Sequence, residues 1–324
     1  MKKELIDGTV DENFEPIRES FRHNFTEGWE RGGAAFAVYY HGKLVVDLWG
    51  GYADKSCNRR WNEDTITTIF SCTKNGKEDI NIQMILAHKA GLPYFEPALT
   101  LADLTDGLRM ATIVEQEAPK FLPGTRTAYH PLTYGWLVDQ VRVARLTGLN
   151  PLLAVREFLY DRKIATIGRY ALDPRGYFSK GLRNMRNFGK DFTLYNNPET
   201  RYAGQPAVNG VGSARGLALV HQLAMDGTLL SNELKQKIFQ PLFVDEFDHS
   251  IGELQSKGYG FMFTRSPTGS WQVGHMGVGG QIVRFDPEND IVLCYLTNAF
   301  KAGSGEHVFT YNRLQRKVYE IIKK

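Results

Sequence analysis

Hydrophobic residues recur every three to four positions near both ends of the chain. Near the N-terminus these residues are Phe14, Ile17, Phe21, Phe25 and Trp29. Such spacing puts them on one face of a helix, so we expect an amphipathic helix over 14–29 that ends before Gly32 and Gly33. The same spacing over 308–322 predicts a second amphipathic helix that closes the chain.

Stretches rich in β-branched and aromatic residues predict strands. Residues 34–40 and 43–49 flank His41-Gly42, so we expect a hairpin whose second strand ends at Gly50-Gly51. Alternating patterns predict four more strands near the C-terminus, over 259–264, 270–273, 281–286 and 290–297. A helix followed by antiparallel strands is typical of an α+β fold.

Helical spacing dominates the middle of the chain. It predicts helices over 79–91, 101–116, 131–147 and 213–225, with Ser213 as the N-cap of the last. Pro123-Gly124 predicts a turn, and residues 165–205 predict a long insertion with little periodicity. We therefore expect one domain over 1–324. Its sheet subdomain covers about 14–70 and 257–324, and its helical subdomain covers about 71–256.

The composition is that of an ordinary soluble globular protein. The 324 residues are 42% hydrophobic, and 39 basic against 36 acidic residues give a net charge of +3. This small, evenly spread charge favours a small-molecule partner over nucleic acid or an anionic membrane. The sequence has no apolar run long enough for a membrane span, no secretory signal and no disulfide or zinc spacing among its three cysteines. These features predict a cytoplasmic protein.

Candidate chemistry begins at Ser71-Cys72-Thr73-Lys74. If this stretch is helical, one turn brings the serine hydroxyl and the lysine amine onto one face. An amine whose pKa is lowered by burial or by a second cation can take the serine proton, which gives an activated nucleophile without histidine. The pattern indicates acyl transfer, although roughly one Ser-x-x-Lys is expected by chance in a chain of this length.

Five ordered stretches of the sequence resemble the serine β-lactamase and penicillin-binding-protein superfamily. The closest resemblance is to its class C β-lactamase-related branch, which includes carboxylesterases and β-lactamase-domain proteins of animals. The stretches are 42–51, 69–74, 86–93, 129–136 and 274–280. The resemblance implies a β-lactamase/transpeptidase-like fold, with an antiparallel sheet flanked by terminal helices and a mostly helical subdomain. It also implies an enzyme that needs neither a metal nor an organic cofactor.

The resemblance also implies a role for each site residue. Ser71 is the acylated nucleophile, Lys74 is its base, and Tyr129 relays a proton to the leaving group. The backbone amides of Ser71 and Val278 form the oxyanion hole. Two alternatives stay open. In one, Tyr129 is a buried core residue; in the other, His275 is a strand-edge residue without a chemical role.

The resemblance also constrains the substrate. The family's Lys-Thr-Gly motif is replaced by His275-Met276-Gly277, in which a mostly neutral histidine stands for the lysine and the glycine lets an acyl group approach the strand. Tyr129-His130-Pro131 lacks the asparagine of Tyr-x-Asn, so penicillins are not expected as true substrates. We expect a serine hydrolase of small esters or amides, with esters preferred.

Two further polar residues are assigned supporting roles. His88 is expected to support the fold by hydrogen bonding rather than to act as a ligand. Asn209 is expected to serve turn geometry.

The chain departs from the family directly after Lys74. Family members continue the Ser-x-x-Lys helix, whereas here Asn75-Gly76 signals a turn and Leu86 is only twelve residues after Lys74. A single helical turn is unstable on its own, and a missing helix leaves core surface without a partner. A catalytically impaired or inactive protein with a binding or assembly role is therefore the alternative hypothesis. A splice product, a gene-model error and a degenerate paralogue would each explain the shortening.

Overall fold

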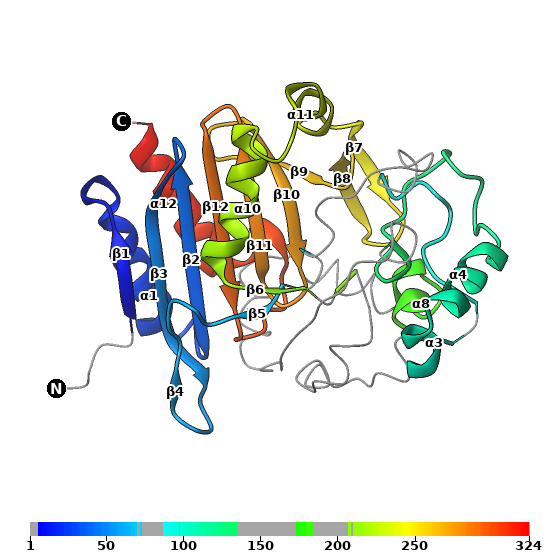
Figure 1. The fold of residues 1–324 in the computed structure, drawn as a ribbon, viewed down its shortest axis with the longest axis horizontal. Helices are drawn as coiled ribbons and strands as arrows, with labels where there is room; N and C mark the ends of the chain where they lie inside the picture. The colour runs from blue at the N-terminus through cyan, green and yellow to red at the C-terminus, as the bar shows by residue number, and fades with distance from the viewer. Residues whose placement is uncertain are drawn as a thin grey trace.

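A ten-stranded antiparallel sheet dominates the computed structural model, which describes residues 6–69, 72, 87–96, 98–134, 173–183, 207–208 and 210–323. Along the sheet the strand order is β1-β3-β2-β12-β11-β10-β9-β8-β7, and β4 pairs with β3 (Figure 1). The strands of this sheet are β1 (Ile6–Val10), β2 (Gly33–Tyr40), β3 (Lys43–Asp54), β4 (Arg59–Arg60), β7 (Phe243–Asp248), β8 (Glu253–Lys257), β9 (Met262–Arg265), β10 (Trp271–Gly277), β11 (Gln281–Asp286) and β12 (Ile291–Thr297). A separate small sheet pairs β5 (Thr67–Thr68) with β6 (Val211–Gly212).

Helices cover both faces of the large sheet. Figure 1 shows α10 (Ala214–Asp226) crossing one face, while α1 (Pro16–Thr26) and α12 (Phe309–Ile322) pack together on the other. The helices α3 (Leu101–Thr105), α4 (Gly107–Gln116) and α8 (Tyr177–Arg183) lie beyond the β7–β8 end of the sheet. The remaining described helices are α11 (Asn232–Ile238) and the short 3-10 helices η1 (Glu12–Phe14) and η5 (Gly305–His307).

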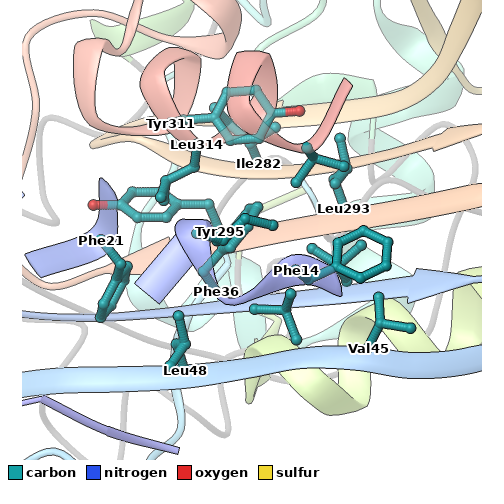
Figure 2. Close-up of a cluster of buried hydrophobic side chains, with 14 of the residues drawn as sticks. Phe14, Phe21, Phe36, Val45, Leu48, Ile282, Leu293, Tyr295, Tyr311 and Leu314 are labelled. Atoms are coloured by element: carbon teal, nitrogen blue, oxygen red, sulfur yellow. The ribbon is translucent and has the colours of Figure 1, made fainter. Parts of the chain in front are cut away.

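Alternation along β2 divides the core into two layers. Ala34, Phe36 and Val38 join the layer under α1 and α12, and the intervening residues of β2 join the layer under α10. Successive side chains of a strand point to opposite faces, so a strand that is covered on both sides is apolar throughout. Figure 2 shows the first layer, in which aromatic side chains from α1, β2, β12 and α12 meet.

The terminal elements agree with the sequence predictions. The two terminal helices, the hairpin turn at His41-Gly42 and the strands over 281–286 and 290–297 are present, with small shifts of their ends. Ser213 caps α10 by accepting a hydrogen bond from the Gly216 amide at 3.1 Å. The antiparallel α+β fold expected from the sequence is confirmed.

Several predicted boundaries were wrong. Strand β3 continues past Gly50-Gly51 to Asp54, because Gly51 permits a close approach of β2: a Cβ there would lie 2.0 Å from the Gly32 carbonyl oxygen. The predicted helix over 101–116 is two helices, separated by the extended backbone of Asp106. Residues 243–256 were assigned to the helical subdomain, but they contain β7 and most of β8 of the sheet. Their charged residues, typical of strands at a sheet edge, obscured the alternation.

Other predicted elements are only partly described. Of the helix expected over 79–91, residues 79–86 lie outside the described residues, and 87–91 form turns in which His88 has a φ of 57°. Most of the helix expected over 131–147 also lies outside them. The region 165–205 was predicted to lack regular structure, yet its described part contains α8.

A buried ion pair joins the loop between α1 and β2 to the segment that follows β12. The Lys301 ammonium lies 3.0 Å from a carboxylate oxygen of Glu30, and neither side chain is exposed to solvent. Glu30 also accepts hydrogen bonds from the hydroxyls of Tyr295 and Thr297, at 2.5 and 3.0 Å. Lys301 donates to the Trp29 carbonyl at 2.8 Å. Each charge is thus compensated by a partner and by additional hydrogen bonds.

Removing one charge of this pair should strongly destabilise the fold. We expect Lys301→Met to lower the free energy of unfolding by about 3 to 5 kcal/mol, because Glu30 would be left buried without its counter-ion. Urea denaturation measures the change. Lys237→Met on α11, which removes an exposed ion pair with Glu233, should change stability by about 0.5 kcal/mol or less. Equal stability of the two variants would contradict this prediction.

His221 on α10 is buried against the sheet. Its ring centroid lies 5.9 Å from that of Phe285, and Nδ1 donates to the Leu217 carbonyl at 2.8 Å. Burial disfavours the charged imidazolium and lowers the pKa of His221 to about 4. The folded protein therefore holds this side chain neutral at neutral pH.

This pKa predicts a loss of stability on mild acidification. Between pH 6.5 and 4 the unfolded chain binds a proton at His221 that the folded chain does not, so the unfolding free energy falls as pH falls. We expect His221→Gln, which keeps a donor, to reduce the difference in unfolding free energy between pH 7 and pH 5 by about 2 kcal/mol. The control His23→Gln, at a half-exposed position of α1, should leave that difference unchanged. Identical pH dependence in wild type and His221→Gln would refute the prediction.

Candidate functional site

The residues that flank Ser71 contact β10. Ser71 and Lys74 themselves lie outside the described residues, but Ile69 and Cys72 are described. The Cys72 thiol donates to the carbonyl of His275 at 3.3 Å. A Cβ added to Gly277 would lie 2.5 Å from the carbonyl oxygen of Ile69, so only glycine fits there. The two ends of this short stretch thus lie against the predicted strand motif.

Tyr129 and the end of β10 line one cleft. Tyr129, Gly277 and Val278 line a cavity of about 100 Å³. Its other lining residues are Phe178, Ser250, Ile251, Glu253, Met262, Met276 and Ser304. Tyr129 is 7% exposed, and its ring centroid lies 6.2 Å from that of His275. The structure therefore brings together four of the six residues predicted for the site, and the other two are not described.

His275 is held in one orientation beside this cleft. The side chain is buried, and its Nδ1 lies 2.6 Å from the carbonyl oxygen of Met276. A carbonyl oxygen only accepts, so this hydrogen bond requires a proton on Nδ1. No lysine or arginine is among the described residues that line the cavity, where Glu253 is the charged side chain.

Two glycines shape the turn that presents Val278. Gly279 and Gly280, between β10 and β11, have φ values of 84° and 99°, which side chains rarely adopt. A Cβ on Gly279 would also lie 2.6 Å from the ring of Phe300. The Gly279 carbonyl accepts a hydrogen bond from the Lys301 amide at 3.0 Å. The turn, with Val278 39% exposed, is therefore anchored to the segment that carries the buried Lys301.

The backbone around Tyr129 is irregular but fully hydrogen-bonded. The amide of Ala128 donates to the carbonyl of His88 at 3.0 Å, and the amide of His130 donates to the Nδ1 of His88 at 3.1 Å. Between them, the amide of Tyr129 donates to Asp248 at 3.1 Å. Buried amides outside helices and sheets need such partners. The supporting role expected of His88 is confirmed.

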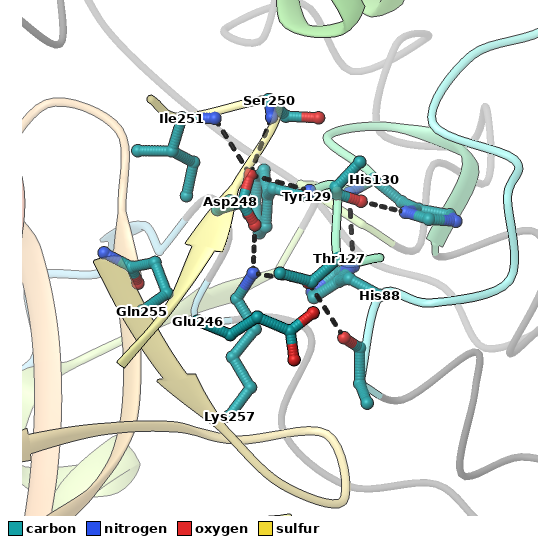
Figure 3. Close-up of polar contacts among 12 residues, drawn as sticks. His88, Thr127, Tyr129, His130, Glu246, Asp248, Ser250, Ile251, Gln255 and Lys257 are labelled. Carbon is teal, nitrogen blue, oxygen red and sulfur yellow. Dashed lines mark hydrogen bonds and ion pairs between the residues drawn. The ribbon is translucent and has the colours of Figure 1, made fainter. Parts of the chain in front are cut away.

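Asp248 and Lys257 form a second buried ion pair behind Tyr129 (Figure 3). Neither side chain is exposed, and Lys257 also donates to the Thr127 hydroxyl at 3.3 Å. Burial alone would raise the pKa of Asp248, but the nearby Lys257 charge and the hydrogen bonds to the carboxylate hold that pKa below its ordinary value. The sequence alone identifies neither residue, because an acidic or basic residue outside a recognised motif is ordinarily solvent-exposed.

His130 is neutral in this environment. Its Nδ1 donates to the Ala128 carbonyl at 2.5 Å, and its Nε2 accepts from the Leu92 amide at 3.2 Å. Burial lowers the pKa of His130 to about 4. The residue that follows Tyr129 therefore fixes the local backbone as an uncharged donor and acceptor.

The described residues offer neither a metal site nor a helix that could cross a membrane. They contain no group of three or more histidine, cysteine, aspartate or glutamate side chains arranged to bind a metal ion. None of the described helices is both long enough and apolar enough to cross a membrane.

Solved structures share this architecture. A penicillin-binding-protein homologue from Caulobacter crescentus is 22% identical and superposes with a TM-score of 0.75, covering 98% of this chain and 99% of the other. A family VIII carboxylesterase is 23% identical, with the same TM-score and coverage. At this level of identity the likeness concerns the fold.

Sequence comparison extends the likeness to a curated relative and a family. The chain is 27% identical to the esterase/beta-lactamase LipL of Mycobacterium tuberculosis, covering 90% of this chain and 82% of the relative. That alignment spans 359 residues, more than the 324 of this chain, so the relative has residues without a counterpart here. The beta-lactamase family model matches residues 21–75 and 74–317, two segments that meet directly after the Ser-x-x-Lys motif. With nearly its whole length matched, the chain belongs to the beta-lactamase family.

Proposed function

We propose that this protein is a serine hydrolase that cleaves small carboxylic esters or amides, with esters preferred, through an acyl-enzyme at Ser71. The observation that supports this most is the meeting of three predicted motifs. Ile69 and Cys72, on either side of Ser71, contact β10 at Gly277 and His275, and Tyr129 lines one cavity with Gly277. Membership of the beta-lactamase family and similarity to an esterase/beta-lactamase add to this support.

The proposed reaction proceeds in two stages. Ser71 Oγ attacks the ester carbonyl carbon while the Lys74 amine accepts the hydroxyl proton. The backbone amides of Ser71 and Val278 donate hydrogen bonds to the developing oxyanion. Tyr129 donates its phenolic proton to the departing alcohol as the ester bond breaks and takes back the proton that Lys74 holds. Water then attacks the acyl-enzyme, releases the carboxylic acid and restores Ser71.

A second candidate function is a catalytically impaired or inactive protein with a binding or assembly role. The break of the family match at residues 74–75 favours it, because the missing segment follows the proposed nucleophile and base directly. The two candidates differ in whether Ser71 reacts. A serine-reactive covalent probe that labels Ser71 in the folded chain would exclude the inactive alternative.

The proposal predicts a complete dependence of ester turnover on Ser71. We expect Ser71→Ala to reduce hydrolysis of a short-chain p-nitrophenyl ester by about 10³-fold or more, down to the uncatalysed background. Ser56→Ala, in the exposed turn between β3 and β4, is the matched control and should retain the wild-type rate. Equal rates in wild type and Ser71→Ala would end the proposal.

The cleft charge predicts a preference for uncharged substrates. Glu253 lies in the cavity wall, where one carboxylate oxygen accepts from the side-chain amide of Gln255 at 2.6 Å and the other lies 3.8 Å from His307 Nε2. We expect Glu253→Gln to raise the ratio of kcat/KM for an anionic ester to that for a neutral ester by about fivefold at low salt. Glu233→Gln on α11 should leave the ratio unchanged. A ratio that is the same in wild type and Glu253→Gln would show that this carboxylate does not select substrates.

A further inference from the structure

One carboxylate oxygen connects two chain segments that line the cleft. Asp248 Oδ1 accepts hydrogen bonds from three backbone amides: Ser250 at 2.7 Å, Ile251 at 2.9 Å and Tyr129 at 3.1 Å. Tyr129 comes from a segment more than a hundred residues away in the sequence, whereas Ser250 and Ile251 follow β7 directly. Figure 3 shows these hydrogen bonds. All three donor residues line the same cavity.

The second oxygen holds the carboxylate in place. Asp248 Oδ2 pairs with the Lys257 ammonium, which also donates to the Thr127 hydroxyl, two residues before Tyr129. The His249 amide donates to the Thr127 carbonyl at 3.1 Å. The carboxylate can therefore neither rotate nor shift without breaking contacts on the Tyr129 segment and on the β7–β8 hairpin.

No regular element fixes Tyr129 independently. Residues 126–130 belong to neither a helix nor a strand, so their positions depend on individual hydrogen bonds. Moreover, a buried ion pair is a poor choice for stability alone, since apolar residues of similar volume often serve as well. Both facts favour a geometric purpose for Asp248.

We propose that Asp248 is a positioning residue that sets the position of the Tyr129 phenol relative to residues 250–251 of the cleft, with Lys257 fixing its orientation. This inference rests on the proposed hydrolase function. Tyr129 acts there as the group that protonates the leaving alcohol. Misplacing it should therefore slow the expulsion of poor leaving groups more than that of good ones.

Two double variants isolate the role of Oδ1. Asp248→Asn/Lys257→Met keeps an oxygen acceptor for the three amides, whereas Asp248→Leu/Lys257→Met removes it. Neither double variant leaves a buried charge without its counter-ion, so the two variants are matched for electrostatics. The substrates are p-nitrophenyl butyrate and ethyl butyrate, which form the same acyl-enzyme. Nitrophenolate leaves without a proton, whereas ethanol must receive one.

The expected result is a selective loss of kcat/KM. In Asp248→Leu/Lys257→Met, kcat/KM should fall about 100-fold for ethyl butyrate but less than about tenfold for p-nitrophenyl butyrate. Tyr129→Phe should show the same two losses. Asp248→Asn/Lys257→Met should keep the wild-type ratio of the two values within about threefold. If the role were purely structural, kcat/KM would fall equally for both esters in the leucine variant, and that outcome would overturn the proposal.

Folding and the parent hypothesis are controlled separately. If circular dichroism shows that the leucine variant is unfolded, Asp248→Glu replaces it, because this change keeps the charge and moves the acceptor by one methylene. It must then show the same selective loss on ethyl butyrate, and equal losses would refute the positioning role. If wild-type turnover does not depend on Ser71, the proposed function fails and this inference fails with it. If turnover does depend on Ser71 but the ratio of kcat/KM for the two esters is the same in the leucine variant as in wild type, only the positioning role fails.

Discussion

The pairing of β2 with β12 is the constraint on which the rest of the structure depends. Seven residue pairs, from Ile291 with Tyr40 to Thr297 with Ala34, join the two ends of the chain at the centre of the sheet. Between these two strands the chain leaves the sheet after β4 and re-enters it at β7. The entropy of closing so long a loop grows only slowly with its length, so burial of two apolar layers along these strands can offset it.

Buried charges occur where irregular segments meet this sheet. Glu30 with Lys301 anchors the turn beside Val278, and Asp248 with Lys257 anchors the backbone of Tyr129. Irregular backbone cannot satisfy its polar groups by repetition, whereas a carboxylate can accept several donors from different directions. Both pairs thus provide fixed geometry next to the cleft, at positions where apolar packing would leave donors unpaired.

The sequence predicted the parts of the fold that follow from local periodicity. The terminal helices repeat apolar residues every three to four positions, and the hairpin and the strands β11 and β12 are short stretches rich in β-branched and aromatic residues. Both signals are visible without tertiary context. Asp248 and Lys257 lack such a signal, because their burial results from contacts with a segment more than a hundred residues away. Family motifs point to Tyr129, His275, Gly277 and Val278. Asp248, whose carboxylate holds the Tyr129 amide, belongs to none of the five stretches that resemble the family.

The two halves of the proposed site differ in what supports them. Tyr129, Gly277 and Val278 are held by β10, by the glycine turn and by the two buried ion pairs, all among the described residues. Ser71 and Lys74, the proposed nucleophile and base, stand instead where the two segments of the family match meet. In the proposed mechanism, the departure from the family after Lys74 therefore bears first on the base and on the hydroxyl and backbone amide of Ser71. A chain that kept only a binding role would retain the half with Tyr129, Gly277 and Val278, so substrate binding without turnover is the specific signature of the inactive alternative.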